Sequence, residues 1–464
     1  MPSVAAGWSR PAAIVVAVAF FLENFDGVIL VTASPAIARD FGVPAADVGS
    51  ASTAYLLAVA VFIPVSGWAA DRWGARRVFC VAIAVFVVAS LLCSLSSNIV
   101  ALVGARVLQG IGGSMMVPVG RLIVLRETDK RDLLRAIAFL TWPALVAPVV
   151  APLAGGLVTQ YLGWPWIFYL NLPLGIALFV AAVRFVPAVA VSASRSLDVR
   201  GLLGVSVTLV SLVLGLEWMT APDGPAAGSA LLVVALVAGL ATVRWLSRAQ
   251  HPFLDLSTFR IPTFRVTNSS GVWYRAAVSA VPFLLPLLLQ EGFGWNPVLA
   301  GAMVMALFAG NLAVKPATSW LIRTFGFAPV IIASAVGVAA TLVATALMPV
   351  GTPLWLMATV FALSGAFRST GFTAYGTIQF ADIDAAEMPA ANTLSSTLVQ
   401  IAAGLGVAIG AVAVRLAPGD DDGAEPYRWA LVVVAAIGAL SALGALRLGP
   451  DAADTVRRGI SRAG

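Results

Sequence analysis

The sequence predicts an all-α integral membrane protein with 14 transmembrane helices: two pseudo-symmetric six-helix bundles and an inserted helix pair. Three observations lead to this prediction. Of the 464 residues, 60% are hydrophobic and only 11% are charged, and the mean hydropathy is +0.95, which is far too apolar for a soluble domain. Apolar stretches long enough to cross a bilayer recur along the whole chain, and the basic residues gather in alternate gaps between them.

A helix needs about 20 residues to cross the hydrocarbon core of a bilayer. The gaps between the apolar stretches are short and carry turn residues such as Pro222 and Pro225, so a sizeable soluble domain has no room. We expect three units, at residues 1–200, 201–250 and 251–464. The expected spans cover residues 11–34, 47–70, 78–97, 99–120, 133–160, 166–187, 201–219, 226–246, 266–290, 297–319, 327–349, 353–376, 389–416 and 427–448.

The distribution of basic residues predicts the orientation, because cytoplasmic segments hold most lysines and arginines. With both termini in the cytoplasm, three basic residues fall outside (Arg39, Arg415 and Arg428) and four lie deep within spans (Arg106, Arg275, Lys315 and Arg368). The first span follows a short N-terminal segment without a cleavage site, so we expect it to be retained. The net charge of +6 is then explained by orientation and anionic lipid, without nucleic acid.

Glu23 and Asp26 lie in the middle of the first span, where ionisable groups are rare. Each costs about 2.5 to 3.5 kcal/mol at the centre of a membrane helix, so such residues usually face a protein interior or a watery cavity. Their spacing places both carboxyl groups on one helix face, where they can share a proton, a cation or an arginine. We interpret them as a proton or ion site; the alternative is that they hold helices together by pairing with a buried arginine.

Several enzyme classes are excluded by missing motifs. The sequence has no GxSxG, no GxxxxGK[ST] and no HExxH pattern. Cys80 and Cys93 are thirteen residues apart on one expected helix, too far for a disulfide, and His251 is the only histidine. We therefore expect no enzyme, no cofactor and no metal site, and energy from an ion gradient or from none.

An internal repeat favours a transporter. The segment GWAADRWGARRV, residues 67–78, is echoed by SWLIRTFGFAPV, residues 319–330, with Trp68, Gly74 and Val78 matching Trp320, Gly326 and Val330. The offset of 252 residues covers eight spans, which places an inserted helix pair between two homologous halves. Repeats that pack around a site at the membrane midplane are the architecture of alternating access.

The first copy of this segment carries a specific motif. Its residues match G-x-x-x-D-R-x-G-R-[RK]-[RK], the cytoplasmic signature of the major facilitator superfamily, with only the first arginine of the closing run lost, to Ala75. Glycine permits close helix approach and a tight turn, and the charges can form a latch at the helix ends. The alternative is an ordinary basic loop. The expected latch consists of Gly67, Asp71, Arg72, Gly74, Arg76 and Arg77.

Further stretches resemble the fourteen-helix drug:proton antiporter family of that superfamily. DGVILVTASP, residues 26–35, resembles its first-helix signature, and Leu102, Arg106, Gln109 and the glycines at 110, 112 and 113 resemble L-x-x-x-R-x-x-Q-G-x-G. The family associates this buried arginine with proton transfer. WPWIFYLNLPLG, residues 164–175, and PFLDLSTFRIPTF, residues 252–264, are also family-like, and GGSMMVPVGRL with Arg275 and Lys315 resembles an enterobacterial branch.

The antiporter signature of the fifth span departs from the family pattern. G-P-x-x-G-P-x-x-G-G is here residues 147–156, with Ala147 and Ala151 in place of the first two glycines. Pro148 and Pro152 should still kink the helix, and Gly155 and Gly156 remain, but each alanine adds a methyl group at a helix contact. Antiport, as opposed to another coupling mode, is therefore less firmly implied.

The resemblance implies a proton-coupled exporter of drugs or metabolites. We expect Asp26 to be the principal proton carrier, Glu23 an auxiliary acid whose like charge favours protonation, and Arg106 a switchable counter-charge. The expected partners are protons, the lipid bilayer of a bacterial inner membrane and a small-molecule substrate, with the protein acting as a monomer.

The expected substrate cavity lies on spans 1, 2, 4, 5, 9, 10, 12 and 13. It has an apolar and aromatic set (Trp142, Trp273, Tyr274, Asn311, Asn392 and Gln400) that suits amphipathic molecules, although each aromatic could simply be helix packing. Arg275, Lys315 and Arg368 favour instead an organic anion such as citrate or a metal–citrate chelate, unless these side chains snorkel to the interface. A non-transporting receptor or scaffold is the alternative from another class.

Overall fold

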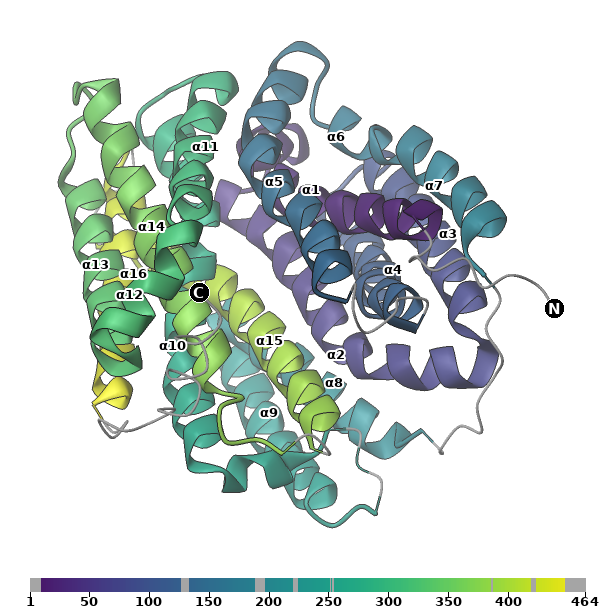
Figure 1. Cartoon of the computed structure of the whole chain (residues 1–464). Coiled ribbons are helices and arrows are strands. Elements are labelled where there is room, and N and C mark those ends of the chain that lie inside the picture. Colours follow the sequence, from purple (N-terminus) through teal and green to yellow (C-terminus); the bar gives the residue numbers. More distant parts are fainter. Residues whose placement is uncertain are drawn as a thin grey trace.

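The computed structural model describes residues 10–126, 133–187, 197–219, 224–250, 252, 254–384, 387–418 and 423–446. Over these residues the chain forms long helices joined by short turns (Figure 1). His251 and the acidic residues Asp420 to Asp422 lie outside the described residues.

The N-terminal half contains α1 (Arg10–Phe41), α2 (Gly49–Trp73), α3 (Ala75–Ser94), α4 (Ile99–Arg126), α5 (Leu133–Tyr161), α6 (Trp166–Tyr169) and α7 (Asn171–Phe185). A pair follows, α8 (Val199–Met219) and α9 (Pro225–Leu246). The C-terminal half contains α10 (Pro262–Leu287), α11 (Pro297–Ala313), α12 (Lys315–Phe325), α13 (Phe327–Leu347), α14 (Leu354–Ile378), α15 (Met388–Arg415) and α16 (Glu425–Ala445). Short turns η1 (Ala45–Val48), η2 (Leu256–Arg260) and η3 (Leu288–Gly292) complete the described elements.

The helices are consistent with the 14 predicted crossings. In the described ranges, 12 helical segments are each long and apolar enough to cross a membrane, and α11 with α12, bent by 51° at their junction, adds a thirteenth. The remaining predicted span corresponds to α14, which is long enough at 25 residues but less apolar. The chain is thus a multi-pass membrane protein.

The two halves repeat the same packing. In the first half α1 packs on α5, α4 packs on α2 and α3, and α3 packs on α7; in the second, α10 packs on α15, α14 on α11 and α13, and α13 on α16. The halves meet where α5 contacts α11 and α2 contacts α15, while α8 and α9 pack on each other beside α2 and α15. The pair is therefore peripheral to two pseudo-symmetric bundles. The exact divisions near residues 200 and 250 stay a prediction.

The sequence repeat marks one turn in each half. Gly74 joins α2 to α3 with φ of 88°, and Gly326 joins α12 to α13 with φ of 83°. A residue with a Cβ atom is strained at such positive φ values, so glycine is required at both turns. The weak echo at an offset of 252 residues therefore reports the same backbone geometry in both halves.

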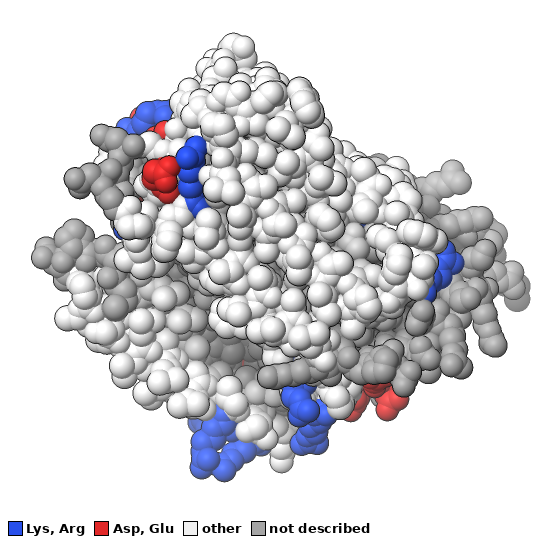
Figure 2. All heavy atoms as spheres, turned by 90° about the vertical axis from the view of Figure 1, so that its left-hand side faces the viewer, with Lys and Arg blue, Asp and Glu red and all other residues white. Residues whose placement is uncertain are grey.

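The outer surface suits a lipid environment. On the face shown in Figure 2, the charged side chains lie near the margins and the broad middle is uncharged. Many large apolar side chains are exposed on α3, α7, α8 and α9, which a hydrocarbon solvent tolerates and water does not.

Candidate functional site

A sealed ion pair lies at the centre of the N-terminal half. Asp26 on α1 and Arg106 on α4 both have 0% of their surface exposed, and Nη1 of Arg106 lies 2.5 Å from Oδ2 of Asp26. A buried pair is tolerable only when the remaining lone pairs and protons are also satisfied. The pairing expected between a first-span acid and a buried arginine is therefore present for Asp26.

Neutral polar side chains from α3, α4 and α7 surround the carboxylate of Asp26. Gln109 on α4 donates to Oδ1 of Asp26 at 2.9 Å, and Asn171, the first residue of α7, donates to the same oxygen at 2.6 Å. Gln109 also accepts from Arg106 at 2.7 Å and donates to Ser90 on α3 at 2.8 Å. Asp26 thus joins α1, α3, α4 and α7 through one connected network.

The guanidinium of Arg106 is bounded by aromatic rings on its other side. Its central carbon lies 4.3 Å from the ring centre of Tyr55 and 6.0 Å from that of Phe168. Its Nε and Nη2 atoms have no hydrogen-bond acceptor among the described residues. Part of the arginine charge is therefore stabilised by ring faces instead of by hydrogen bonds.

Glu23 occupies a different environment, although it lies one turn from Asp26 on α1. Its carboxylate accepts from the Tyr55 hydroxyl at 3.3 Å and from Asn24 at 3.0 Å, and it lines a cavity. Their spacing allows the two acids to share a partner, but in this structure each has its own hydrogen-bond partners: Tyr55 and Asn24 for Glu23, and Arg106, Gln109 and Asn171 for Asp26.

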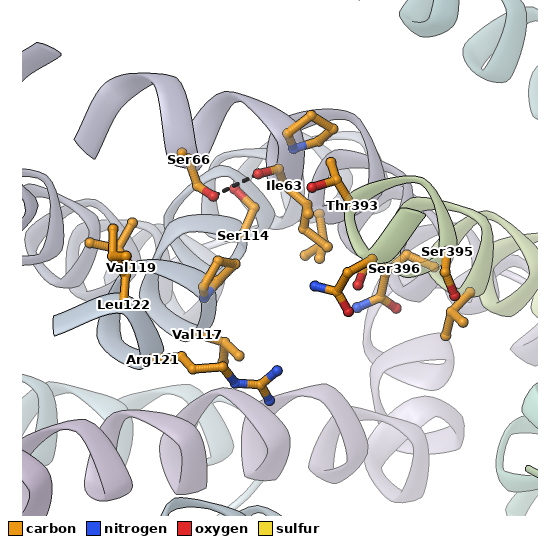
Figure 3. A pocket seen from close by; sticks show the side chains of 18 of the residues that line it. Ile63, Ser66, Ser114, Val117, Val119, Arg121, Leu122, Thr393, Ser395 and Ser396 are labelled. Carbon is orange, nitrogen blue, oxygen red and sulfur yellow. Dashed lines mark hydrogen bonds between the residues drawn. The ribbon is translucent and has the colours of Figure 1, made fainter. Parts of the chain in front are cut away.

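The cavity that Glu23 lines has a volume of about 600 Å³ and lies between α1, α2, α4, α14 and α15. Figure 3 shows Arg121 and Val117 of α4 on one side and Thr393 and Ser396 of α15 on the other. Polar groups are frequent in its wall, and they are Glu23, Asn24, Ser66, Ser114, Arg121, Gln379, Asn392, Thr393, Ser395, Ser396 and Gln400. Of the predicted substrate residues, Asn392 and Gln400 lie here.

A second cavity, of about 370 Å³, lies between α1, α5, α10, α11 and α14. It contains the predicted residues Asn311, Lys315 and Arg368. Lys315 donates to Thr373 at 3.0 Å, and the Arg368 guanidinium lies 5.4 Å from the ring centre of Phe308. Within the described ranges neither cation forms an ion pair, and none of the residues lining this cavity is acidic.

Comparison with known proteins places this arrangement in a family. The model of the Major Facilitator Superfamily matches residues 16–260 and 269–462. The chain belongs to the Major Facilitator Superfamily. It is 33% identical over 446 residues to the putative multidrug resistance protein MdtD of Cronobacter sakazakii, covering 94% of each chain, and 33% identical over 401 residues to that of Serratia proteamaculans, covering 86% and 84%. The expected enterobacterial resemblance is confirmed.

Solved structures agree with this fold. The POT family transporter PepTSo matches with a TM-score of 0.69 at 13% identity, covering 98% of each chain. The nucleoside transporter NupG matches with a TM-score of 0.68 at 12% identity, covering 94% of this chain and 99% of its own. These structures show the same fold. Membership of the superfamily and the relatives make the protein a membrane transport protein and not an enzyme, which speaks against the receptor or scaffold alternative.

Four predicted substrate residues line neither cavity. Trp142 and Trp273 are 60% and 47% exposed, whereas Tyr274 is buried and donates to the carbonyl oxygens of Phe367 and Arg368 at 2.9 and 3.2 Å. Arg275 is 2% exposed and donates to Asn268 at 3.1 Å and to Gln379 at 3.2 Å. Burial also rules out snorkelling for Arg275 and Arg368 here, while Lys315 is part-buried.

The superfamily latch residues surround the turn at Gly74. Arg76 donates to the carbonyl of Val183 on α7, and the Arg72 guanidinium lies 6.0 Å from the Trp68 ring centre. Asp71 also has an interaction partner, and Arg77 lines an apolar groove between α2, α3 and α4. The close helix approach expected at Gly67 is absent: a Cβ atom there would meet nothing within 4 Å, because Gly67 faces the larger cavity.

The family-like residues of α5 form the contact between halves. The helix runs through Pro148 and Pro152 without a break. A Cβ atom at Gly156 would collide with the carbonyl of Pro297 on α11, and one at Gly155 would lie 2.9 Å from Ile29 on α1. Ala147 and Ala151 are fully buried, so the structure accommodates both added methyl groups.

One end of the molecule is closed by links between the halves. Arg39 at the end of α1 pairs with Glu291 of η3 at 3.1 Å, and Arg415 at the end of α15 pairs with Asp47 of η1. Gln290 donates to the carbonyl of Thr32 at 2.9 Å. The larger cavity lies toward the other end, where Gly67 and Arg121 are found.

Sequence reasoning missed four residues of the site. Ser90 and Tyr55 stand in spans where no motif drew attention to them, whereas Gln109 and Asn171 lay inside family-like stretches without an assigned role. An amide side chain inside an apolar span is the signal that could have identified Gln109 and Asn171, because it needs a partner in lipid.

Proposed function

We propose that the protein is a proton-coupled exporter of amphipathic small molecules that works by alternating access in a bacterial inner membrane. The observation that supports this proposal most is the sealed Asp26–Arg106 pair, one helical turn from a cavity-lining acid. A proton that binds Asp26 cancels its charge and leaves Arg106 as an uncompensated cation, so the two protonation states favour different packing.

The cavity supports a small-molecule substrate. Its volume of about 600 Å³ suits a drug-sized molecule, and the relatives are called putative multidrug resistance proteins. Binding energy at the cavity and proton binding at Asp26 would be linked, because each ligand changes the affinity for the other by the same factor.

The orientation belongs to the same proposal. We assign the end with Gly67 and the Gly74 turn to the cytoplasm, where basic segments accumulate, and both termini to that side. The described conformation is then inward-facing, with the ion pairs of Arg39 and Arg415 closing the outer side.

Transport into proteoliposomes tests the proposal. Purified protein would be reconstituted with a lumen pH indicator, and ethidium flux would be measured with and without a proton gradient. We expect gradient-driven ethidium movement, with proton movement in the opposite direction when substrate is added. Flux that is insensitive to the gradient would contradict proton coupling, and absence of any flux for all tested substrates would contradict transport of this class.

Export of an organic anion is a second candidate, favoured by one observation. Arg368 is 8% exposed and lines the second cavity beside Lys315, and its Nε and Nη1 atoms have no acceptor among the described residues. A buried cation without a counter-ion is costly unless an anion arrives. Competition between citrate and ethidium in the same vesicles distinguishes the candidates, because a citrate exporter would transport citrate and ignore the cationic dye.

A further inference from the structure

The two first-helix acids differ in access to the larger cavity. Glu23 lines the larger cavity, whereas Asp26 is fully buried. A proton or a cationic substrate that enters from this cavity therefore meets Glu23 first. Since the two carboxylates have separate hydrogen-bond partners, any effect of Glu23 on the sealed pair must pass through another group or through space.

Tyr55 on α2 makes contact with both sites. It is 2% exposed, its hydroxyl donates to Oε1 of Glu23 at 3.3 Å, and its ring centre lies 4.3 Å from the guanidinium carbon of Arg106. Among the described residues, Tyr55 and Glu23 interact with each other, with Asp26 and, for Tyr55, with Arg106, and Arg121 lines the same cavity as Glu23. One rigid ring thus connects a cavity-lining acid with a buried cation.

Two glycines of α4 let α2 approach closely at Tyr55. A Cβ atom at Gly110 would lie 2.6 Å from the Tyr55 carbonyl oxygen, and one at Gly113 would lie 3.0 Å from the Tyr55 hydroxyl and 3.6 Å from Glu23 Cγ. By contrast, a Cβ atom at Gly104 of the same helix would meet nothing within 4 Å. Two of the glycines in the α4 motif are therefore explained by the position of Tyr55.

We propose that Tyr55 is a positioning residue that transmits the state of Glu23 to the Asp26–Arg106 pair. While Glu23 is ionised and free, its carboxylate accepts the long hydrogen bond from the Tyr55 hydroxyl, and the ring lies over Arg106. When a proton or a cationic substrate occupies Glu23, this hydrogen bond weakens and the ring can leave the guanidinium face. This inference rests on the proposed proton-coupled function.

A double-mutant cycle tests the role of the hydroxyl. Tyr55→Phe keeps the ring and removes only the hydroxyl, and Glu23→Gln removes the charge that the hydroxyl contacts. We expect Tyr55→Phe to lower the maximal rate of gradient-driven ethidium transport about tenfold, as for loss of one hydrogen bond to a charged group. In the Glu23→Gln background the same change should have a clearly smaller effect, because the acceptor of the hydroxyl is then a neutral amide oxygen in place of a carboxylate.

A purely structural role for Tyr55 predicts a different pattern. Tyr55→Phe would then lower the unfolding temperature and would reduce transport equally in the wild-type and Glu23→Gln backgrounds. Equal reductions therefore overturn the proposal, and so does a wild-type transport rate for Tyr55→Phe. Gly113→Ala, which displaces the hydroxyl, should reproduce the transport defect, and Gly104→Ala is the matched control with unchanged transport. If the wild-type protein showed no proton coupling, the proposed function would fail; if only Tyr55→Phe behaved as wild type, this inference alone would fail.

Discussion

The two halves of the molecule share their helix packing but treat buried charge in opposite ways. In the N-terminal half, Arg106 faces an acid at 2.5 Å and the pair is fully buried. In the C-terminal half, Arg275 is held by the neutral side chains of Asn268 and Gln379, and the Nε and Nη1 atoms of Arg368 have no acceptor among the described residues. The two halves therefore share their helix packing, but their buried arginines have different partners.

This difference suits the two halves to different tasks, proton exchange in the N-terminal half and anion binding in the C-terminal half. A matched acid and base can exchange a proton for a change in packing, whereas bases without an acid favour a negative ligand. Arg106 and Arg275 are also each one group away from the larger cavity: Tyr55 links Arg106 to Glu23, and Gln379 links Arg275 to the cavity wall.

The largest expected effect is on stability, and it comes from removing one buried arginine in each half of the molecule. Arg106→Leu leaves Asp26 buried without its counter-charge, which should cost about 3–5 kcal/mol of stability. Arg368→Leu removes a cation that has no acidic partner, so its stability should change little or rise. Thermal unfolding in detergent measures both, and equal losses would show that the halves do not differ in this respect.

A smaller loss of stability is expected from overpacking at the contact between α5 and α11, where the two halves are equivalent. Gly156→Leu and Gly301→Leu each place a side chain against a backbone carbonyl of the other half, that of Pro297 or of Pro152. Overpacking of this kind typically costs about 1–3 kcal/mol, and it should slow transport without changing the number of protons moved per substrate. Gly27→Leu, where a Cβ atom would meet nothing within 4 Å, is the control. Unequal results for Gly156 and Gly301 would break the symmetry of the interface.

The second cavity tests whether the unpaired bases bind an anion. Lys315→Met keeps the length of the side chain and removes its charge, so citrate should bind at least about tenfold more weakly, as expected for one charge-assisted contact. Ethidium binding should be unchanged. Isothermal titration with each compound measures the two affinities, and unchanged citrate affinity would remove Lys315 from an anion site.

The smallest expected effect concerns the closed end. The Arg39–Glu291 pair has side-chain exposures of 63% and 32%, and exposed pairs contribute about 0–1 kcal/mol. Arg39→Ala combined with Asp47→Ala should still favour opening of this end, visible as faster thiol labelling of a cysteine introduced at position 43. Labelling rates equal to those of the parent would show that these pairs do not hold the end closed.

Much of this architecture could be predicted from the sequence, because membrane spans and basic loops leave strong one-dimensional signals. The Gly74 turn was predictable for the same reason, since positive φ restricts the residue type. The different partners of Glu23 and Asp26 could not be predicted, because helical spacing fixes only the shared face and not which neighbouring side chains each carboxylate meets. The exposure of Trp142 and the burial of Tyr274 could not be predicted, because aromatic residues pack and face lipid as readily as they line cavities.

Proton exchange at Asp26 during ligand binding is the central claim, and it can be measured without vesicles. Protein in weakly buffered detergent would be titrated with ethidium while a pH indicator reports protons released, for the wild type and for Asp26→Asn. We predict that the wild type releases protons on binding and that Asp26→Asn binds ethidium with no release. The same proton release from Asp26→Asn as from the wild type would contradict the account.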